Sequence, residues 1–452
     1  MKEILTIKNI IIALFALFAI VAFLIFSGFI KVGKSAQQAR GSVVVWGTIP
    51  FSVMQPYIDK IQDTHLTVTY SEKKEATYES ELINAFASGT GPDLFIMSHE
   101  AILRNSDKVF EVPYTSFRKD IYENSYISEA RLFLTETGIL AFPLFVDPLV
   151  MYYNKPLIAS YSPTFSLRLP QYWSEFQEFA REVTQYNETG EVIISAVGLG
   201  TFDNILHAKD ILATLFIQNG NQIVGTNTTT GKKQSVLTFN ETALGQSEEI
   251  VNFYTSFSRF GSTNYSWNEA LLDTQNSFIS GNLAVYFGLG SEAGDIRMKN
   301  PNLDFGVMRF PQKCDPFTSG CNNSSAYTFG AMTGIAVSKH SKNLPAALAV
   351  ASKVAGGDIV KGLATDFQVA PARKDILSSL LQERAGDPLN ILRYESAVIA
   401  TGWFDPDNRE TENIFSSLIR NVNSLALSSR QALAQTQAAL NLLLDRTINL
   451  RA

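Results

Sequence analysis

The chain has 452 residues, of which 46% are hydrophobic and 18% are charged, and its formal net charge is −6 at pH 7. This is the composition of a globular protein that is long enough for two domains with separate cores. The mildly acidic balance, without stripes of Lys and Arg, argues against nucleic-acid binding.

Residues 10–30 form an apolar run that only Ser27 and Gly28 interrupt. The run has about the 20 residues that cross a bilayer as a helix, and it is longer than the core of a usual signal peptide. We therefore expect an uncleaved, single-pass transmembrane anchor, with a cleaved signal as the alternative. Basic residues lie on both sides of the run, so charge hardly decides its topology. The expected order is a cytoplasmic segment 1–9, the anchor or signal-anchor 10–30 and a linker 31–41.

Strand-like and helix-like segments alternate after the linker. Buried-strand patterns at 43–46, 66–70 and 93–97 are separated by helical patterns at 53–61 and 78–88. This alternation predicts an α/β domain with a largely parallel sheet, in which ligands bind beyond the carboxyl ends of the strands. Trp46 and Glu100 lie at two of those ends.

The segment FPLFVDPLVMYYNK at 142–155 is extended and apolar but contains one carboxylate, Asp147. An acid buried there needs a partner, a solvent-filled cleft or a ligand. The alternation then resumes, and the predicted elements are helices at 174–184, 208–218, 248–260, 267–279 and 345–354, strands at 192–199, 283–287 and 334–338, and a second crossing at 303–310.

The chain carries no catalytic motif of a known kind. Cys314 and Cys321, its two cysteines, are close together and predict a small disulfide loop in an oxidising compartment. The glycine-rich loop 288–294 lacks the third glycine of a dinucleotide site in register, and no metal spacing or nucleophile motif occurs. We expect no cofactor and no enzymatic activity. The acidic segment 405–410 lacks the glycine turn of a calcium loop and is expected to be a solvated loop.

Six segments support a family resemblance, and they occur in the family's order: AFASGTGPD at 85–93, the crossing at 142–155, a Trp-x-x-Phe helix start at 173–176, SFISGNLAV at 277–285, GIAV at 334–337 and VAPAR at 369–373. On these segments the chain resembles extracellular solute-binding proteins of ABC importers, the class typified by maltose-binding protein. The resemblance implies a two-lobe periplasmic-binding-protein type II fold that closes on a ligand like a hinge. Lobe 1 would hold residues 42–145 and 311–370, and the hinge and lobe 2 would hold 146–310 and 371–452.

The resemblance also implies roles for two carboxylates. Asp147 takes the place of an acid that contacts sugar hydroxyls, and ionised carboxylates accept strong hydrogen bonds from hydroxyl groups. The alternative is a hinge acid that pairs with a lysine or an arginine. Glu100 takes the place of a second sugar-binding acid, with a solvated loop glutamate as the alternative.

The other cleft candidates are aromatic, glycine and polar residues. Trp403 falls where relatives stack an aromatic ring on a sugar, and Trp46 is either a cleft residue or a core residue. Gly290 and Met97 stand where relatives have aromatic residues, so a ligand would approach the backbone of Gly288 and Gly290 closely. The remaining candidates precede the helix at 208–218, and they are Asp203, Asn204 and His207.

These features predict a membrane-tethered solute-binding component of an ABC importer, with its body outside the cytoplasmic membrane. The expected partners are a small-molecule solute, with a sugar favoured, and a membrane permease, and the soluble body is expected to be monomeric. One alternative is a tethered ligand sensor of the same fold. The other is a carbohydrate-active enzyme, which would need two carboxylates across a cleft.

Overall fold

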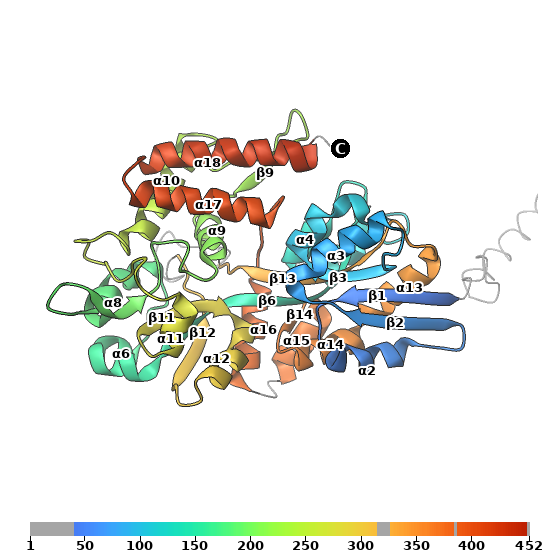
Figure 1. Cartoon of the computed structure of the whole chain (residues 1–452), viewed down its shortest axis with the longest axis horizontal. Helices are drawn as coiled ribbons and strands as arrows, with labels where there is room; N and C mark the ends of the chain where they lie inside the picture. Colours follow the sequence, from blue (N-terminus) through green and yellow to red (C-terminus); the bar gives the residue numbers. More distant parts are fainter. Residues whose placement is uncertain (1–39, 314–325, 384–386, 450–452) are drawn as a thin grey trace, which may run out of the picture.

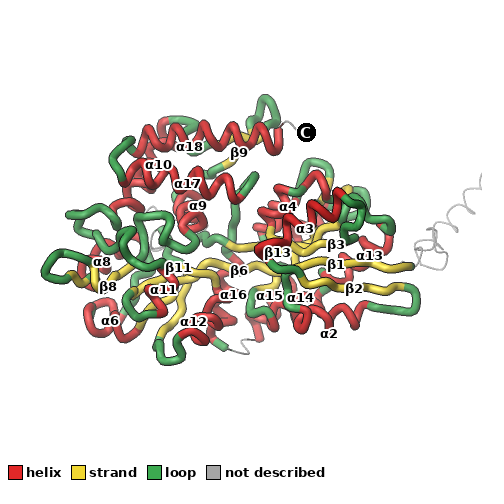
Figure 2. The backbone as a smooth tube through the Cα atoms, in the orientation of Figure 1, coloured by secondary structure: helices red, strands yellow, loops and turns green. Residues whose placement is uncertain are grey.

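The computed structural model describes residues 40–313, 326–383 and 387–449. At its centre lies the strand β6 (Ala141–Asn154), in which every residue but Tyr153 is buried. Figures 1 and 2 show β6 passing through the middle of the molecule, with one half on each side. We call the half that contains β1, β2 and β3 the first half, and the half that contains β8 and β11 the second half.

One sheet of ten strands runs through both halves. Its order is β2-β1-β3-β13-β6-β11-β8-β7, and β12 and β14 also pair with β6. In the first half β1 is parallel to β2 and β3, while β13 is antiparallel to β3 and β6. In the second half β11 is antiparallel to β6 and parallel to β8. These strands are β1 (Gly41–Gly47), β2 (Leu66–Glu72), β3 (Leu94–Ser98), β7 (Gln185–Tyr186), β8 (Val192–Val197), β11 (Leu283–Leu289), β12 (Phe305–Arg309), β13 (Gly330–Val337) and β14 (Ala370–Pro371).

Helices cover both faces of this mixed sheet, so that its central strands are buried on both sides. In Figure 1, α9, α17 and α18 lie above the sheet of the second half, and α14, α15 and α16 lie below β6 and β14. The helices of the first half are α2 (Phe51–Ile61), α3 (Glu75–Ala87), α4 (His99–Arg104), α5 (Lys119–Ser125), α13 (Leu344–Val354), α14 (Gly357–Asp366) and α15 (Lys374–Glu383). The others are α6 (Lys155–Tyr161), α7 (Pro163–Leu167), α8 (Phe176–Val183), α9 (Ala208–Gln218), α10 (Glu241–Ser256), α11 (Thr274–Ile279), α12 (Ala293–Lys299), α16 (Pro388–Val398), α17 (Asn408–Asn423) and α18 (Ser429–Leu444).

The buried apolar side chains form two clusters that meet within β6. The first cluster contains β6 residues up to Val146, and the second begins at Leu149. Asp147 therefore lies at the junction of two hydrophobic cores. The predicted boundary at residue 371 does not coincide with this packing. Leu377 and Tyr394 belong to the first core, because α15 and α16 lie against β14.

Local sequence signals explain several helix ends. The helix predicted at 208–218 is α9, and it ends where Gly220 takes a left-handed φ of 82°. The helix predicted at 267–279 is wrong in length, since α11 begins only at Thr274. Trp267 is instead fully buried outside the helix, and its indole nitrogen donates to Asn204 Oδ1 at 3.2 Å.

Two predictions fall outside the described residues. These are the anchor at 10–30 and the disulfide between Cys314 and Cys321, and both stay predictions. Within 40–313, 326–383 and 387–449, the structure contains no helix with the length and apolarity that a bilayer crossing requires.

Candidate functional site

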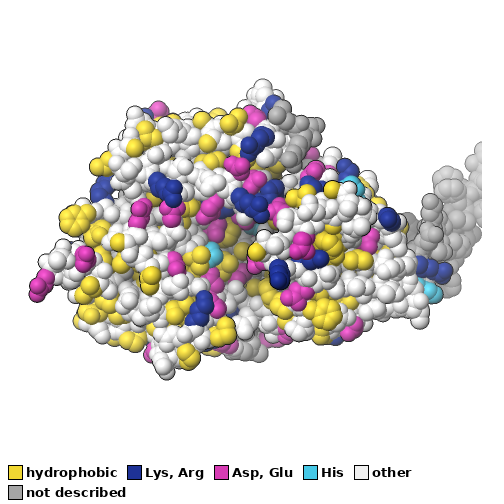
Figure 3. All heavy atoms as spheres, viewed as in Figure 1, with side chains coloured by type: hydrophobic (Ala, Val, Ile, Leu, Met, Phe, Trp, Pro, Cys, Tyr) yellow, Lys and Arg dark blue, Asp and Glu magenta, His cyan; other side chains and the backbone are white. Residues whose placement is uncertain are grey.

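Polar side chains from both halves meet where the strands of the sheet end beside β6. The first half contributes α4, which begins at the end of β3 because Ser98 accepts the amide of Ala101 at 3.3 Å. The second half contributes α9, the segment 401–407 and the start of α17. Figure 1 shows the start of α17 beside α3 and α4, and Figure 3 shows this face hollowed between the halves, with acidic side chains at the edge of the hollow.

Lys209 of α9 lies at the centre of this group. Its ammonium group is 2.8 Å from Asp405 Oδ2 and 3.3 Å from Glu100 Oε1, so it links the two halves. The side chains of Lys209 and Asp405 are 6% and 0% exposed. Burial alone would lower the pKa of Lys209, but Asp405, Glu100 and Asp210 raise it above its usual value. Lys209 is therefore a buried cation that is held among carboxylates.

Asp405 was expected in a solvated loop, and that prediction is wrong. Its carboxylate is fully buried, accepts the hydroxyl of Thr411 at 2.8 Å and pairs with Lys209. Burial raises the pKa of Asp405 to about 6, with Lys209 opposing the rise and Glu100 adding to it. Buried charges persist only when they are paired and hydrogen-bonded, and Asp405 meets both conditions.

Glu129 is a second buried carboxylate near this group, and among the residues that the structure describes it has no hydrogen-bond partner. It is 2% exposed, and neither of its oxygens makes a hydrogen bond. A Cβ atom built on Gly330 would lie 2.3 Å from Glu129 Oε2, and one built on Gly402 would lie 2.9 Å from Oε1. The carboxylate therefore lies against backbone that only glycine leaves open. Burial raises the pKa of Glu129 well above its usual range, and the charges of Glu100 and Asp210 raise it further.

A second set of ion pairs joins the halves beside the first. Arg104, at the end of α4, donates to Glu79 of α3 at 2.6 Å and to Asp407 at 3.2 Å. Asp407 caps α17 through the amides of Arg409 and Glu410, and the guanidinium of Arg409 is 3.2 Å from Glu79. The side chains of Arg104, Glu79 and Asp407 are 12–20% exposed, so these pairs are shielded from water more than surface pairs.

His207 joins two carboxylates of the second half. Its Nε2 atom is 2.7 Å from Glu292 Oε1, and its Nδ1 atom is 3.5 Å from Asp210 Oδ2. Burial would lower the pKa of His207, but the hydrogen bonds and charges of Asp210 and Glu292 raise it to about 10. The imidazole is therefore a cation at neutral pH.

The structure places Asp147 at the junction of the two cores. Its carboxylate accepts the amide of Ser291 at 3.1 Å, and Arg393 is among the charges that stabilise it. Burial raises the pKa of Asp147 to about 6. Successive residues of a strand point to opposite faces, and Val146 faces Glu129 across Gly330, so Asp147 projects from the other face of β6. Arg393 thus lies near Asp147, and both the ligand role of Asp147 and its pairing with a lysine or an arginine stay predictions.

Protein side chains occupy the space beside the two candidate glycines. A Cβ atom on Gly288 would lie 2.5 Å from the ring of Tyr286, and one on Gly290 would lie 2.9 Å from Arg393 Cγ. The carbonyl of Gly290 accepts Arg393 Nε at 2.8 Å. Both glycines are thus needed for packing, and contact of their backbone with a ligand is untested.

The two candidate tryptophans differ in their surroundings. Trp46 is half-buried at the end of β1, and the ammonium of Lys73 lies 3.7 Å above its ring. Trp403 is 5% exposed and packs against Phe415, with ring centroids 6.0 Å apart. Its indole nitrogen is buried without a hydrogen-bond partner. Trp403 therefore contributes to the second core while its donor stays unused.

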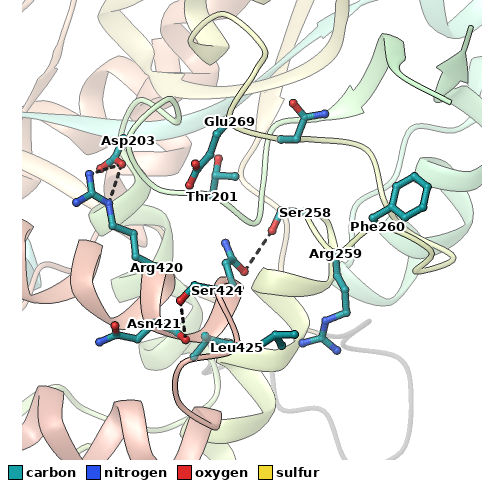
Figure 4. Close-up of a pocket in the computed structure, with 13 residues that line it drawn as sticks. Thr201, Asp203, Ser258, Arg259, Phe260, Glu269, Arg420, Asn421, Ser424 and Leu425 are labelled. Atoms are coloured by element: carbon teal, nitrogen blue, oxygen red, sulfur yellow. Dashed lines mark hydrogen bonds and ion pairs between the residues drawn. The ribbon is translucent and has the colours of Figure 1, made fainter. Parts of the chain in front are cut away.

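Asp203 and Asn204 hold loops of the second half. Asn204 donates to the carbonyls of Asn268 and Leu271 at 2.9 and 3.1 Å, so its amide is used within the protein. Asp203 accepts Arg420 Nε at 2.9 Å, and Figure 4 shows the two side chains turned toward each other at the edge of a separate pocket of about 830 Å³. The exposed ring of Phe260 lies at another edge of that pocket.

Lys209, Glu129 and Arg104 were not predicted as site residues from the sequence. Lys209 precedes the mostly apolar stretch 211–217 of the helix, and this was a usable signal, because lysine is almost never buried unless it is paired. Glu129 and Arg104 stand in ordinary polar surroundings and carry no such signal. In the described part of the chain, no group of three or more His, Cys, Asp or Glu side chains is arranged to hold a metal ion.

Comparison with known proteins identifies the family. The profile of the bacterial extracellular solute-binding proteins matches residues 46–356. The chain belongs to this family. No curated protein sequence matches the chain significantly.

Solved structures of the same fold agree with this assignment. A cyclo/maltodextrin-binding protein in complex with maltotetraose has a TM-score of 0.67 at 14% identity, over 91% of this chain and 98% of its own. The cyclic α-maltosyl-1,6-maltose binding protein of Arthrobacter globiformis has a TM-score of 0.70 at 15% identity, over 90% of this chain and 100% of its own. The MalE domain of Bdellovibrio bacteriovorus, bound to maltotriose, has a TM-score of 0.62 at 15% identity, with coverages of 90% and 100%. At these identities the likeness establishes the fold.

The family and the fold confirm the resemblance seen in the sequence. The chain is an extracellular solute-binding protein with the α/β periplasmic-binding-protein fold, and it serves as the solute-binding component of an ABC transporter. This family binds solutes without transforming them, which confirms the prediction that the chain is not an enzyme.

Proposed function

We propose that this solute-binding protein is tethered to the cytoplasmic membrane, captures a saccharide between its two halves and presents it to a membrane permease. The proposal of a saccharide ligand rests on one observation: hydrogen-bonding side chains from both halves meet beside β6, around Lys209 and Glu100. Carboxylates and ammonium groups pair well with sugar hydroxyls, and a cleft that excludes water strengthens such bonds. Relatives of the same fold were solved with maltotetraose, maltotriose and mannotriose, which supports a saccharide as the solute.

Closure of the halves supplies the signal for transport. A ligand shifts a conformational equilibrium only by its differential affinity for the two states. A solute that contacts α4 from one side and α9 from the other has that property, because both contacts exist only when the halves are together.

The proposal of a saccharide ligand is tested by isothermal titration calorimetry of the purified 452-residue chain with a panel of mono- and oligosaccharides, amino acids and peptides. We expect a saccharide to bind with a Kd of about 1 μM, which corresponds to roughly −8 kcal/mol. Binding of amino acids or peptides without any saccharide would contradict the proposal. The tether is tested separately by fractionating cells that express the chain: a body that washes off intact membranes at high salt would contradict an uncleaved anchor.

A further inference from the structure

The polar group between the halves has a large excess of acid. Glu100 and Asp405 contact the ammonium of Lys209, and Asp210 and Glu412 interact with it through their charges. Glu129 interacts in turn with the charges of Glu100 and Asp210. Lys209 is shared by Glu100 and Asp405. Ionised carboxylates that share one cation repel one another, and a low local dielectric increases the repulsion. A neutral ligand would leave that repulsion in place.

Glu129 shows that this acidity is not fully satisfied within the protein. It is 2% exposed with both oxygens unpartnered, and the other carboxylates that raise its pKa are Glu100 and Asp210. One oxygen of Asp210 is also buried without a partner. An unpaired buried acceptor of this kind carries its full desolvation cost until a donor reaches it. A cationic donor would favour the ionised form of Glu129, so it would displace the proton that the raised pKa keeps on this carboxyl group and pair with the acceptor that is left.

The same group already binds one ammonium ion of the protein itself. Lys209 Nζ, at 2.8 and 3.3 Å from two carboxylates, shows the coordination that the group provides for a primary amine. A buried donor, the indole nitrogen of Trp403, follows Gly402 directly in the chain, and Gly402 lies against Glu129.

We infer that the solute carries at least one primary ammonium group together with its hydroxyls, as an amino saccharide does, and that Glu129, Asp210 and Glu412 receive the ammonium group. This inference rests on the proposed function, because it assumes a solute held between the halves. Glu412 is exposed on α17, whereas Glu129 is 2% exposed. Neutral saccharides would fill the same space without neutralising these acids.

The test compares ligands that differ only at one position. Glucosamine oligosaccharides with a free amine are titrated beside their N-acetylated and 2-hydroxyl counterparts of equal length and linkage, with spermidine as an amine that has no sugar ring. We expect the ammonium saccharide to bind at least tenfold more tightly than either counterpart at 50 mM salt. The preference should shrink at 500 mM salt, because ions screen charge–charge attraction.

Variants show which carboxylates cause the preference for the ammonium saccharide. Glu129→Gln should lower the ratio of ammonium to neutral affinity at least tenfold, and Asp210→Asn, which probes the same group from the other half, should act in the same direction. Glu188→Gln, which removes an exposed carboxylate from the 187–190 turn, should leave the ratio unchanged. Melting curves of each variant, recorded without ligand, show that it is folded.

The outcomes separate the two proposals. Equal or tighter binding of the neutral saccharides overturns the ammonium inference and leaves the saccharide proposal standing. Binding of spermidine without any saccharide supports the acidic receptor and contradicts the saccharide. If none of these compounds binds while a neutral saccharide of the wider panel does, the ammonium inference is overturned and the saccharide proposal stands; if no saccharide of either set binds, both are overturned.

Discussion

Replacing Lys209 by methionine tests the buried ion pairs that join the halves. Methionine keeps most of the length and apolar volume of the lysine stem, so the packing of α9 is preserved while the charge is removed. Asp405, which is 0% exposed, then loses the cation 2.8 Å from its oxygen, and Glu100 loses its partner in the other half. The substitution therefore isolates charge from shape.

The expected cost follows from the burial of the partner. Breaking a buried pair by removing one ion costs about 3–5 kcal/mol, because the other charge stays behind without compensation. Thr411 and the amide of Asp407 still donate to Asp405, which places the expected loss toward the lower figure. An exposed pair would contribute only about 0–1 kcal/mol. We therefore expect the free energy of unfolding to fall by about 3 kcal/mol.

The assay is urea unfolding at pH 8, followed by circular dichroism and by tryptophan fluorescence so that separate unfolding of the two cores is visible. Lys342→Met, on an exposed lysine, is the matched control and should change stability by less than about 0.5 kcal/mol. Adding Asp405→Asn to Lys209→Met removes the stranded charge and should restore at least half of the loss. The two single variants and the double variant then give the coupling energy directly.

The pH dependence supplies an independent check. The pKa of Asp405 is raised to about 6, so its carboxylate takes up a proton at pH 5 and loses the charge that Lys209 balances. The cost of Lys209→Met should thus be smaller at pH 5 than at pH 8. A loss below 1 kcal/mol at pH 8, or a cost that grows toward pH 5, would refute the description of Lys209 as the cation that compensates buried carboxylates.

Three further outcomes are expected. The pKa of His207 is about 10 in the folded protein against roughly 6.5 in an unfolded chain. Its contribution of up to about 5 kcal/mol to the free energy of unfolding is therefore complete below pH 6.5 and is lost between pH 6.5 and pH 10. His207→Asn should flatten the pH dependence of stability, measured by urea unfolding, over that window, and an unchanged slope would contradict the raised pKa of His207. Gly330→Ala should lower the free energy of unfolding by about 1–3 kcal/mol, because the new Cβ would lie 2.6 Å from Val146 Cγ2. The control Gly245→Ala, within α10, meets nothing within 4 Å and should stabilise the protein by about 0.5–1 kcal/mol. Equal shifts of the melting temperature in the two variants would rule out the clash at residue 330. Arg104→Gln removes the ion pairs of Arg104 with Glu79 and Asp407, the second of which joins the halves. It should weaken solute binding about tenfold and enlarge the radius of gyration measured by X-ray scattering. An unchanged radius together with an unchanged affinity would show that these ion pairs do not hold the halves together.

Local sequence determined the elements and their order. The apolar segment around Asp147 is a buried strand because its side chains are apolar on both faces, and helix 208–218 ends where Asn219 and Gly220 end it. The family resemblance rests on the same local signals, since a helix stop before a strand and a strand before a glycine turn recur in fixed order. These features depend on neighbours within a few residues, so a sequence displays them directly.

Only the tertiary structure decided which polar side chains meet. Asp405 was expected in water, yet it is buried because Lys209, 196 positions earlier in the chain, lies 2.8 Å away. The sequence does not show that Tyr286 and Arg393 fill the space beside Gly288 and Gly290. Burial and charge pairing of this kind depend on contacts between segments that are distant in sequence, and no local pattern records them. The sequence by itself determined the fold and the class of the protein, and the packing of α9 and the 401–407 segment against the first half decided the chemistry of the site.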